Sequence, residues 1–380
     1  MPSEFDEIRP YEDGEIKEAF EGLLADRQFS KIMQGFVPWM PKIVRNGLLR
    51  LAFAGVDTPI QFQLRFMKPV VKYLIRKKTD GFTFDESELP RDKSLRYTFV
   101  SNHRDIVLDS ALLDVALVEA GYPTTVEIGI GNNLLIYPWI ERFVRMNKAF
   151  IVRRGLHPKE MLRSSQLMSR YIHHAVGDKK ENIWIAQREG RAKDSDDRTQ
   201  DSVLKMLAMG GNLRELNIVP LTISYEYDPC DYLKAVEFQQ KRDNPAFKKS
   251  RQDDLDNMRI GIMGYKGRVA YYCGQPINEW IGDYEGLPRN EFFDAVAKRM
   301  DKIIHSNYRL YPCNYIALDC LNGSSDNISH YTAADKTSFE KYIEQQIGKA
   351  TIKDKDEAFL RKMMLTMYAN PLRNYMEATK

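Results

Sequence analysis

The chain has 380 residues, of which 43% are hydrophobic and 29% are charged, so it can bury an ordinary core in one large domain or two modest ones. This composition and the net charge of +3 exclude a disordered or fibrous protein. The four cysteines lie in no paired C-x-x-C arrangement, which indicates neither a disulfide framework nor a zinc site and fits a reducing cytosol.

The N-terminal part is unevenly charged. Residues 1–30 hold nine acidic and three basic residues, with an expected short helix over 15–24, and this acidic start does not resemble an export signal. Residues 31–78 hold ten basic residues, Asp57 as the one acidic residue, and many large apolar side chains. Prolines divide this stretch into several expected helices. Such helices either pack on a core with a basic solvent face or lie on an anionic membrane, and we expect membrane contact.

A polar stretch over residues 79–94 marks the expected boundary to the next part of the chain. From Leu95 onward, β-rich runs alternate with helical patterns, which predicts an α/β fold: a mostly parallel sheet flanked by helices, with sites at the carboxyl ends of the strands. The expected strands span residues 95–101, 124–130, 148–154, 182–187, 216–227 and 266–277.

Beyond Asn290 the pattern becomes helical again. We therefore expect an N-terminal helical part over residues 1–85, a central domain over residues 86–290 and a C-terminal helical part over residues 291–380. The longest stretch without a charged residue, Ile128 to Ile140, falls far short of the roughly 18 to 20 apolar residues that span a bilayer. We expect a cytoplasmic protein that is peripheral on the inner face of a membrane.

The segment Ser101 to Asp109 carries the most informative chemistry. It places His103 at the end of an expected strand and Asp109 at the entrance to the next helix. Acyl transfer to an alcohol needs a base for the hydroxyl proton, and a carboxylate on the other ring nitrogen fixes the imidazole tautomer. Asp105 is the alternative partner of His103, although it can instead cap the helix. Taken alone, a histidine in this position is more often a helix-capping or core residue than a functional one.

Three further elements follow in order. Residues 149–154 end in two arginines, residues 187–191 read Q-R-E-G-R, and residues 219–221 read V-P-L. With the His–Asp element, this order resembles the four signature blocks of the glycerol-3-phosphate and 1-acylglycerol-3-phosphate acyltransferase superfamily, over approximately residues 95–280. The chain departs from the family pattern in two places, because Asp109 comes one residue late and the guanidinium of Arg191 comes one residue early.

The resemblance implies a role for each matching position. It implies a catalytic base at His103, oriented by Asp109, and an acceptor-phosphate site at Arg154 with Arg153 beside it. It also implies acceptor binding by Glu189, Gly190 and Arg191, and a donor-side wall at Pro220. A guanidinium grips phosphate with two parallel hydrogen bonds, which agrees with these roles. Solvated surface arginines are the alternative for Arg153 and Arg191.

The expected reaction moves a fatty acyl group from acyl-CoA or acyl-carrier protein to the hydroxyl of 1-acylglycerol-3-phosphate or glycerol-3-phosphate. We expect no metal or redox cofactor, since His173 and His174 lie outside any zinc-binding pattern, and no nucleic acid partner. One alternative is O-acylation of a lyso-aminolipid, such as an ornithine or glycine lipid. The other is a non-catalytic membrane scaffold with this fold.

Overall fold

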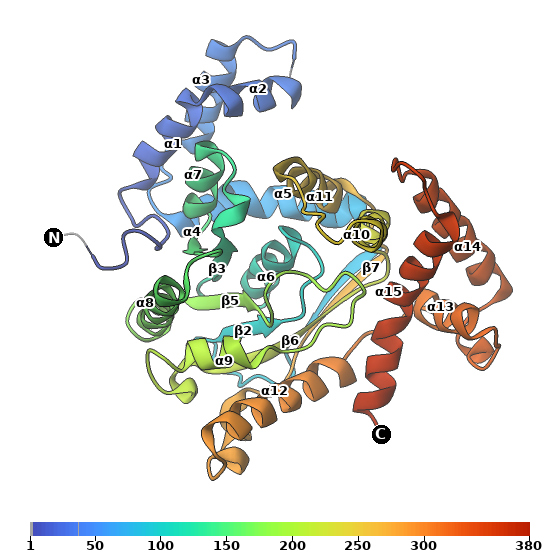
Figure 1. Ribbon diagram of the computed structural model, residues 1–380. Helices are drawn as coiled ribbons and strands as arrows, with labels where there is room; N and C mark the ends of the chain where they lie inside the picture. Colours follow the sequence, from blue (N-terminus) through green and yellow to red (C-terminus); the bar gives the residue numbers. More distant parts are fainter. Residues whose placement is uncertain (1–2, 37) are drawn as a thin grey trace.

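The structure is a computed structural model that describes residues 3–36 and 38–380. Within these residues, seven strands form one sheet in the order β1-β7-β6-β2-β5-β3-β4 (Figure 1). Only the β6–β7 pair is antiparallel, so the predicted α/β fold with a mostly parallel sheet is confirmed. The strands are β1 (Gly81–Asp85), β2 (Thr98–Ser101), β3 (Val126–Gly131), β4 (Ala149–Val152), β5 (Asn182–Ala186), β6 (Ile218–Tyr225) and β7 (Arg268–Cys273).

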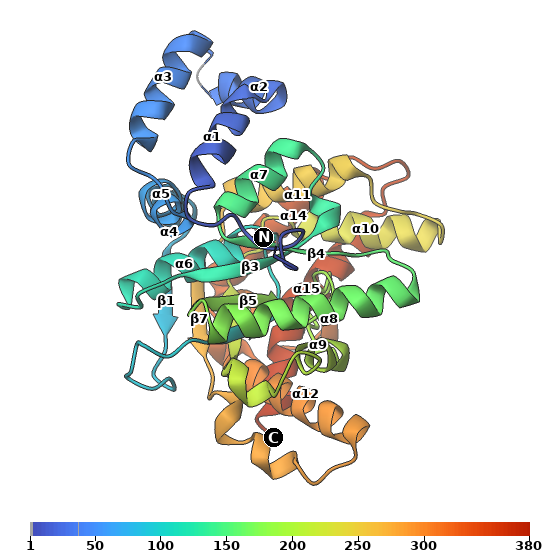
Figure 2. The same ribbon diagram turned by 90° about the vertical axis from the view of Figure 1, so that its left-hand side faces the viewer.

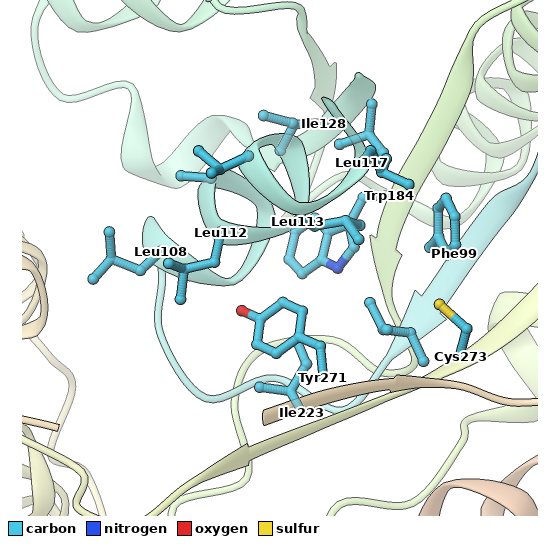
Figure 3. Close-up of a cluster of buried hydrophobic side chains, with 14 of the residues drawn as sticks. Phe99, Leu108, Leu112, Leu113, Leu117, Ile128, Trp184, Ile223, Tyr271 and Cys273 are labelled. Carbon is cyan, nitrogen blue, oxygen red and sulfur yellow. The ribbon is translucent and has the colours of Figure 1, made fainter. Parts of the chain in front are cut away.

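Helices cover both faces of the sheet. The central strands β2 and β6 are buried along their whole length, as expected for parallel strands with helices on either side. On β2, Phe99 packs toward α6 (Leu108–Glu119), whereas the next residue, Val100, belongs to the core under α8 (Pro158–Gly177) and α12 (Arg289–Ser306). Figure 3 shows Leu112, Leu113 and Leu117 of α6 together with Phe99 and Trp184.

The first N-terminal helices form a separate cluster beside the sheet, whereas α5 adds Val71 and Leu74 to the core that contains α6. The core of the separate cluster includes apolar residues of the first helices and Met146 at the end of α7. The tip formed by α2 and α3 stands away from the sheet in both views (Figures 1 and 2). The helices of this region are α1 (Ile16–Ala25), α2 (Arg27–Phe36), α3 (Lys42–Phe53), α4 (Pro59–Phe62), a π-helical turn (Gln63–Met67), α5 (Lys68–Lys78) and, later in the chain, α7 (Pro138–Met146).

The C-terminal helices pack against α10 at the carboxyl end of β6. They share a core of apolar residues with Ala235 of α10. The remaining helices are α9 (Asp201–Leu207), α10 (Asp231–Asp243), α11 (Arg251–Met263), α13 (Pro312–Asn322), α14 (Ala333–Gly348) and α15 (Glu357–Ala378). Within the described residues, no helix is both long and apolar enough to cross a membrane.

Three elements differ from the expectation. The polar stretch 79–94 contains β1, an edge strand that alternates between exposed and half-buried residues and therefore carries little apolar signal. α11 was not expected, and it begins with a capping box between Ser250 and Asp253. α13, which starts with Pro312, was also not expected.

Candidate active site

His103 lies in the loop that joins β2 to α6, at the carboxyl edge of the sheet. Its Nδ1 is 2.8 Å from Oδ2 of Asp109, which occupies the first turn of α6. The same oxygen accepts backbone N–H groups from Arg104 at 2.7 Å and Asp105 at 3.0 Å. Asp109 is fully buried, whereas the His103 side chain is 14% exposed. The carboxylate therefore fixes the ring through Nδ1 and leaves Nε2 as the nitrogen that can accept a proton.

Asp105 caps the helix in this structure. Its Oδ1 accepts the backbone N–H groups of Val107 at 2.9 Å and Leu108 at 2.8 Å. Burial raises the pKa of its carboxyl group, as does the neighbouring charge of Asp109. The capped turn accommodates the additional residue between His103 and Asp109, so the unusual spacing still brings the two side chains together.

The strands on either side of β2 hold the His103 loop. Trp184 of β5 lies edge-on to the His103 ring with centroids 5.5 Å apart, and its indole N–H donates to the Ser101 hydroxyl at 3.1 Å. On the other side, the Asn102 amide exchanges two hydrogen bonds with the backbone of Ile223 in β6, at 2.8 and 2.9 Å. These contacts come from strand pairing, and the sequence pattern did not single out either residue.

Arg188 is a further basic side chain at this edge. Arg188 follows the end of β5 by two residues. Its charge and that of His103 both lower the pKa of the buried Asp197, so both side chains lie near that carboxyl group. Nε of Arg188 is buried and has no hydrogen-bond partner within residues 3–36 and 38–380.

Arg154 and Glu189 come together at the same edge. Nε of Arg154 is 3.8 Å from Oε1 of Glu189, and the arginine side chain is 33% exposed. The backbone N–H of Arg154 donates to Oδ1 of Asn132 at 3.0 Å. A Cβ at Gly131 would lie 3.0 Å from Arg154 Nε, so the glycine makes room for the guanidinium. The ends of β4 and β2 lie three strand spacings apart, roughly 14 Å. The Arg154 side chain extends from β4 toward Glu189, which follows β5, and so covers part of this distance.

Of the other expected site residues, Arg153 and Arg191 contact groups elsewhere. Arg153 pairs with Glu7 of the N-terminal segment at 2.5 Å. Arg191 is buried and donates to Oδ1 of Asn257 in α11 at 3.1 Å, so it joins the E-G-R loop to that helix. Gly190 has a φ of +67°, which an L side chain rarely adopts. Pro220 lies within β6 and pairs with Val100 of β2, away from the strand end.

Buried charges lie beneath the His103 loop. The Lys234 ammonium is 2.5 Å from Oδ2 of Asp228. Burial raises the pKa of Asp228, but the charges of Lys234 and Arg104 outweigh it and bring the pKa to about 2. At Asp197, burial dominates and raises the pKa to about 6, although Arg104 and His103 lower it. An ion pair and a carboxyl group with a raised pKa thus lie near the His103 loop.

Among solved structures, the chain is similar to an acyltransferase. One match is the crystal structure of the 1-acyl-sn-glycerophosphate acyltransferase PlsC from Thermotoga maritima, at 14% sequence identity and a TM-score of 0.38. It covers 75% of this chain and 95% of that chain. No protein-family model and no curated protein matches the chain. Similarity at this level assigns neither a fold nor a reaction, so the chemistry depends on the side chains themselves.

The described part of the chain contains no group of three or more His, Cys, Asp or Glu side chains placed to hold a metal ion. His173 and His174 have separate partners. The His173 ring is 3.0 Å from the carbonyl oxygen of Leu207, whereas the His174 ring is 2.8 Å from Oδ2 of Asp178. Both histidines are therefore engaged in local contacts on or near α8.

Proposed function

We propose that this chain is an O-acyltransferase that moves a fatty acyl group from a thioester to a hydroxyl, with His103 as the general base. The hydrogen bond between His103 Nδ1 and the buried carboxylate of Asp109, at 2.8 Å, carries the proposal. It fixes the ring while Nε2 faces the acceptor, as acid–base chemistry requires. The order of the four sequence blocks supports acyl transfer as the reaction class.

The reaction balances without a covalent acyl-enzyme. Nε2 of His103 takes the proton of the acceptor hydroxyl as its oxygen attacks the thioester carbonyl. The carbon–sulfur bond then breaks, and the departing sulfur receives that proton from the imidazolium. Asp109 stabilises the imidazolium while it exists, and holding both substrates together supplies much of the rate enhancement.

The proposed acceptor is 1-acylglycerol-3-phosphate, with glycerol-3-phosphate as the related candidate. Arg154 supports a phosphate-bearing acceptor because its guanidinium is partly exposed and faces no closer acid than Glu189 within the described residues. We assign Glu189 and Gly190 to the wall of the acceptor site. The contacts of Arg153 with Glu7 and of Arg191 with Asn257 favour supporting roles for both arginines.

The proposed setting is an anionic membrane surface. Trp39 is 76% exposed and Ile43 is 87% exposed, and both lie at the tip of the N-terminal helices. Further exposed apolar side chains and basic residues accompany them, namely Ile32, Val44, Leu48, Leu51, Lys31, Lys42 and Arg50. Exposed apolar residues beside basic ones are typical of helices that lie in a membrane interface. This surface would bring the enzyme to a lipid acceptor.

Thiol release tests the reaction. Purified protein receives palmitoyl-CoA or the matching acyl-carrier protein, together with lysophosphatidate, glycerol-3-phosphate or a lyso-aminolipid. We expect release that depends on lysophosphatidate and falls about 100-fold or more in His103→Ala. His174→Ala is the matched control, because that ring bonds only Asp178 within the described residues, and it should retain activity.

Two results would contradict the proposal. Acceptor-dependent release that survives in His103→Ala would exclude the histidine as base. The absence of release with every donor and acceptor, in folded protein bound to vesicles, would favour a non-catalytic membrane protein. Preference for the lyso-aminolipid would keep the reaction and change the acceptor.

A further inference from the structure

A cavity of about 340 Å³ lies where α10, α11 and α14 meet. It is lined by Tyr232 of α10, Arg259 of α11 and Tyr342 of α14, and by Gly264 and Lys349, which directly follow α11 and α14. A volume of several hundred cubic ångströms is typical of small-molecule sites. None of these residues belongs to the four sequence blocks, so the cavity is separate from the expected acceptor site.

The cavity combines aromatic rings with two cations. Lys349 Nζ is 5.9 Å from the centroid of the Tyr232 ring, and the Arg259 side chain is 72% exposed with Asp256 at 3.7 Å. The Tyr342 hydroxyl donates to Oδ2 of Asp231 at 2.8 Å, which fixes that ring in the wall. Aromatic faces stack on heterocyclic bases, and lysine and arginine bind phosphate. The lining therefore suits a phosphorylated nucleotide.

α11 joins this cavity to the His103 loop. Gly261 of α11 lies directly against the carboxyl group of Asp105, two residues after His103, and a side chain at this position would collide with it. Gly264 lies three residues further on, directly after the end of α11, and packs on Pro229 in the cavity wall. The cavity and the His103 loop thus flank the same end of α11. A ligand with a nucleotide at one end and a flexible arm can contact both.

We propose that this cavity binds the phosphorylated adenine nucleotide of a coenzyme A thioester, which makes the acyl donor a small molecule. The inference rests on the proposed function, since it assigns the donor of the same reaction. A carrier protein presents its thioester on a phosphorylated arm that has no nucleotide. Such a donor has no group that would occupy the cavity or contact the tyrosines and cations that line it.

Calorimetric titration of the full-length protein with adenosine 3′,5′-bisphosphate tests the site. We expect saturable binding to the wild type that is about fivefold weaker in Arg259→Gln and in Lys349→Gln, because each variant loses one partly exposed phosphate contact. Lys298→Gln removes a similarly exposed cation from α12 and should bind as the wild type does. Absent binding to folded wild type, or equal binding to all four proteins, would overturn the proposal.

Two further measurements distinguish a failure of the proposed site from a failure of the proposed reaction. AMP lacks the 3′-phosphate and should bind more weakly, whereas equal affinity would identify a general nucleotide site and overturn the assignment to the donor. In the transfer assay, Arg259→Gln should raise KM for acyl-CoA with little change in kcat. Turnover with an unchanged KM would reject the cavity while the proposed function stands. The opposite outcome is also possible: the bisphosphate binds more weakly to the variants than to the wild type, but no acceptor supports turnover. This result would reject the proposed reaction, while the nucleotide site would stand.

Discussion

Oδ2 of Asp109 accepts three hydrogen bonds at once, from the His103 ring and from the N–H groups of Arg104 and Asp105. The two backbone donors hold the carboxylate in place independently of the imidazole. Its orientation is therefore set before any substrate binds. An oriented base lowers the barrier more than an equally basic group that must find its geometry during the reaction.

Asp109→Asn tests this arrangement. The amide can keep the backbone contacts through its oxygen but then presents its NH₂ group to the ring, which favours the wrong tautomer of His103. We expect kcat to fall about 1,000-fold or more, with a smaller change in KM. The melting temperature serves as the folding control. Near-normal kcat in Asp109→Asn would mean that the carboxylate does not orient a catalytic base.

Asp231 controls a pH-dependent part of the stability. Burial raises the pKa of its carboxyl group from 3.8 to about 7, and the charge of Asp228 adds to the shift. The stabilising contribution of the protonated form is complete below the unfolded pKa and is lost as the pH rises toward 7. Relative to the wild type, Asp231→Asn should therefore gain stability between pH 4 and pH 8, by at most about 4 kcal/mol.

Urea unfolding across this pH range measures the effect. Asp243→Asn is the control with the opposite sign, because hydrogen bonds from Arg242 and Gln239 lower the pKa of Asp243. That variant should lose stability relative to the wild type as the pH rises through the acidic range. A pH-independent difference between Asp231→Asn and the wild type would contradict the assignment to Asp231.

At the scale of elements, the helices α2 and α3 form the tip that we propose to contact lipid. Trp39→Ala with Ile43→Ser removes two of its most exposed apolar groups. Each large side chain contributes about 1.5–3 kcal/mol when fully buried, so partition onto anionic vesicles should fall at least about tenfold. Vesicle sedimentation measures this. Ile328→Ser, at a distant residue that is 62% exposed, is the control and should leave partition unchanged.

Two outcomes would count against a membrane-binding tip. Equal vesicle binding by the double variant and the wild type would place the contact elsewhere. Equal binding of the wild type to neutral and anionic vesicles, at all salt concentrations, would remove the role of the basic residues. Electrostatic attraction to lipid should weaken as salt is added.

The central strands and helices could be predicted because the local sequence of each favours the structure that it adopts. The strand at 98–101 is followed by His103, and the pattern from Leu108 to Glu119 is helical from its own composition. The position of Arg191 could not be predicted, because its partner Asn257 belongs to α11. That helix has no apolar stripe and follows a basic run, so the sequence did not indicate it. Arg188 was missed for a different reason, since its burial near Asp197 depends on how the loop after β5 packs.

At the scale of the whole molecule, the C-terminal helices are tied to the His103 loop through buried polar groups. The Tyr368 hydroxyl of α15 lies 2.8 Å from Oδ2 of Asp231 and accepts the backbone N–H of Asp228 at 3.1 Å. Asp228 in turn holds Lys234 and attracts the buried Arg104, the residue after His103. A residue in the last helix thus contacts the charges beneath the loop. These links cross more than 250 residues of sequence, and no local pattern indicates them.

The edge strand β1 has a consequence for how the chain folds during synthesis. Gly81 pairs with Arg268, so β1 finds its partner only after most of the central domain has left the ribosome. The N-terminal helices precede β1 and emerge first, and contacts this distant in sequence form late. For much of translation, the exposed apolar tip is therefore joined to an unpaired strand. The lipid contact that we propose for the tip would therefore be able to form before β7 arrives to close the sheet.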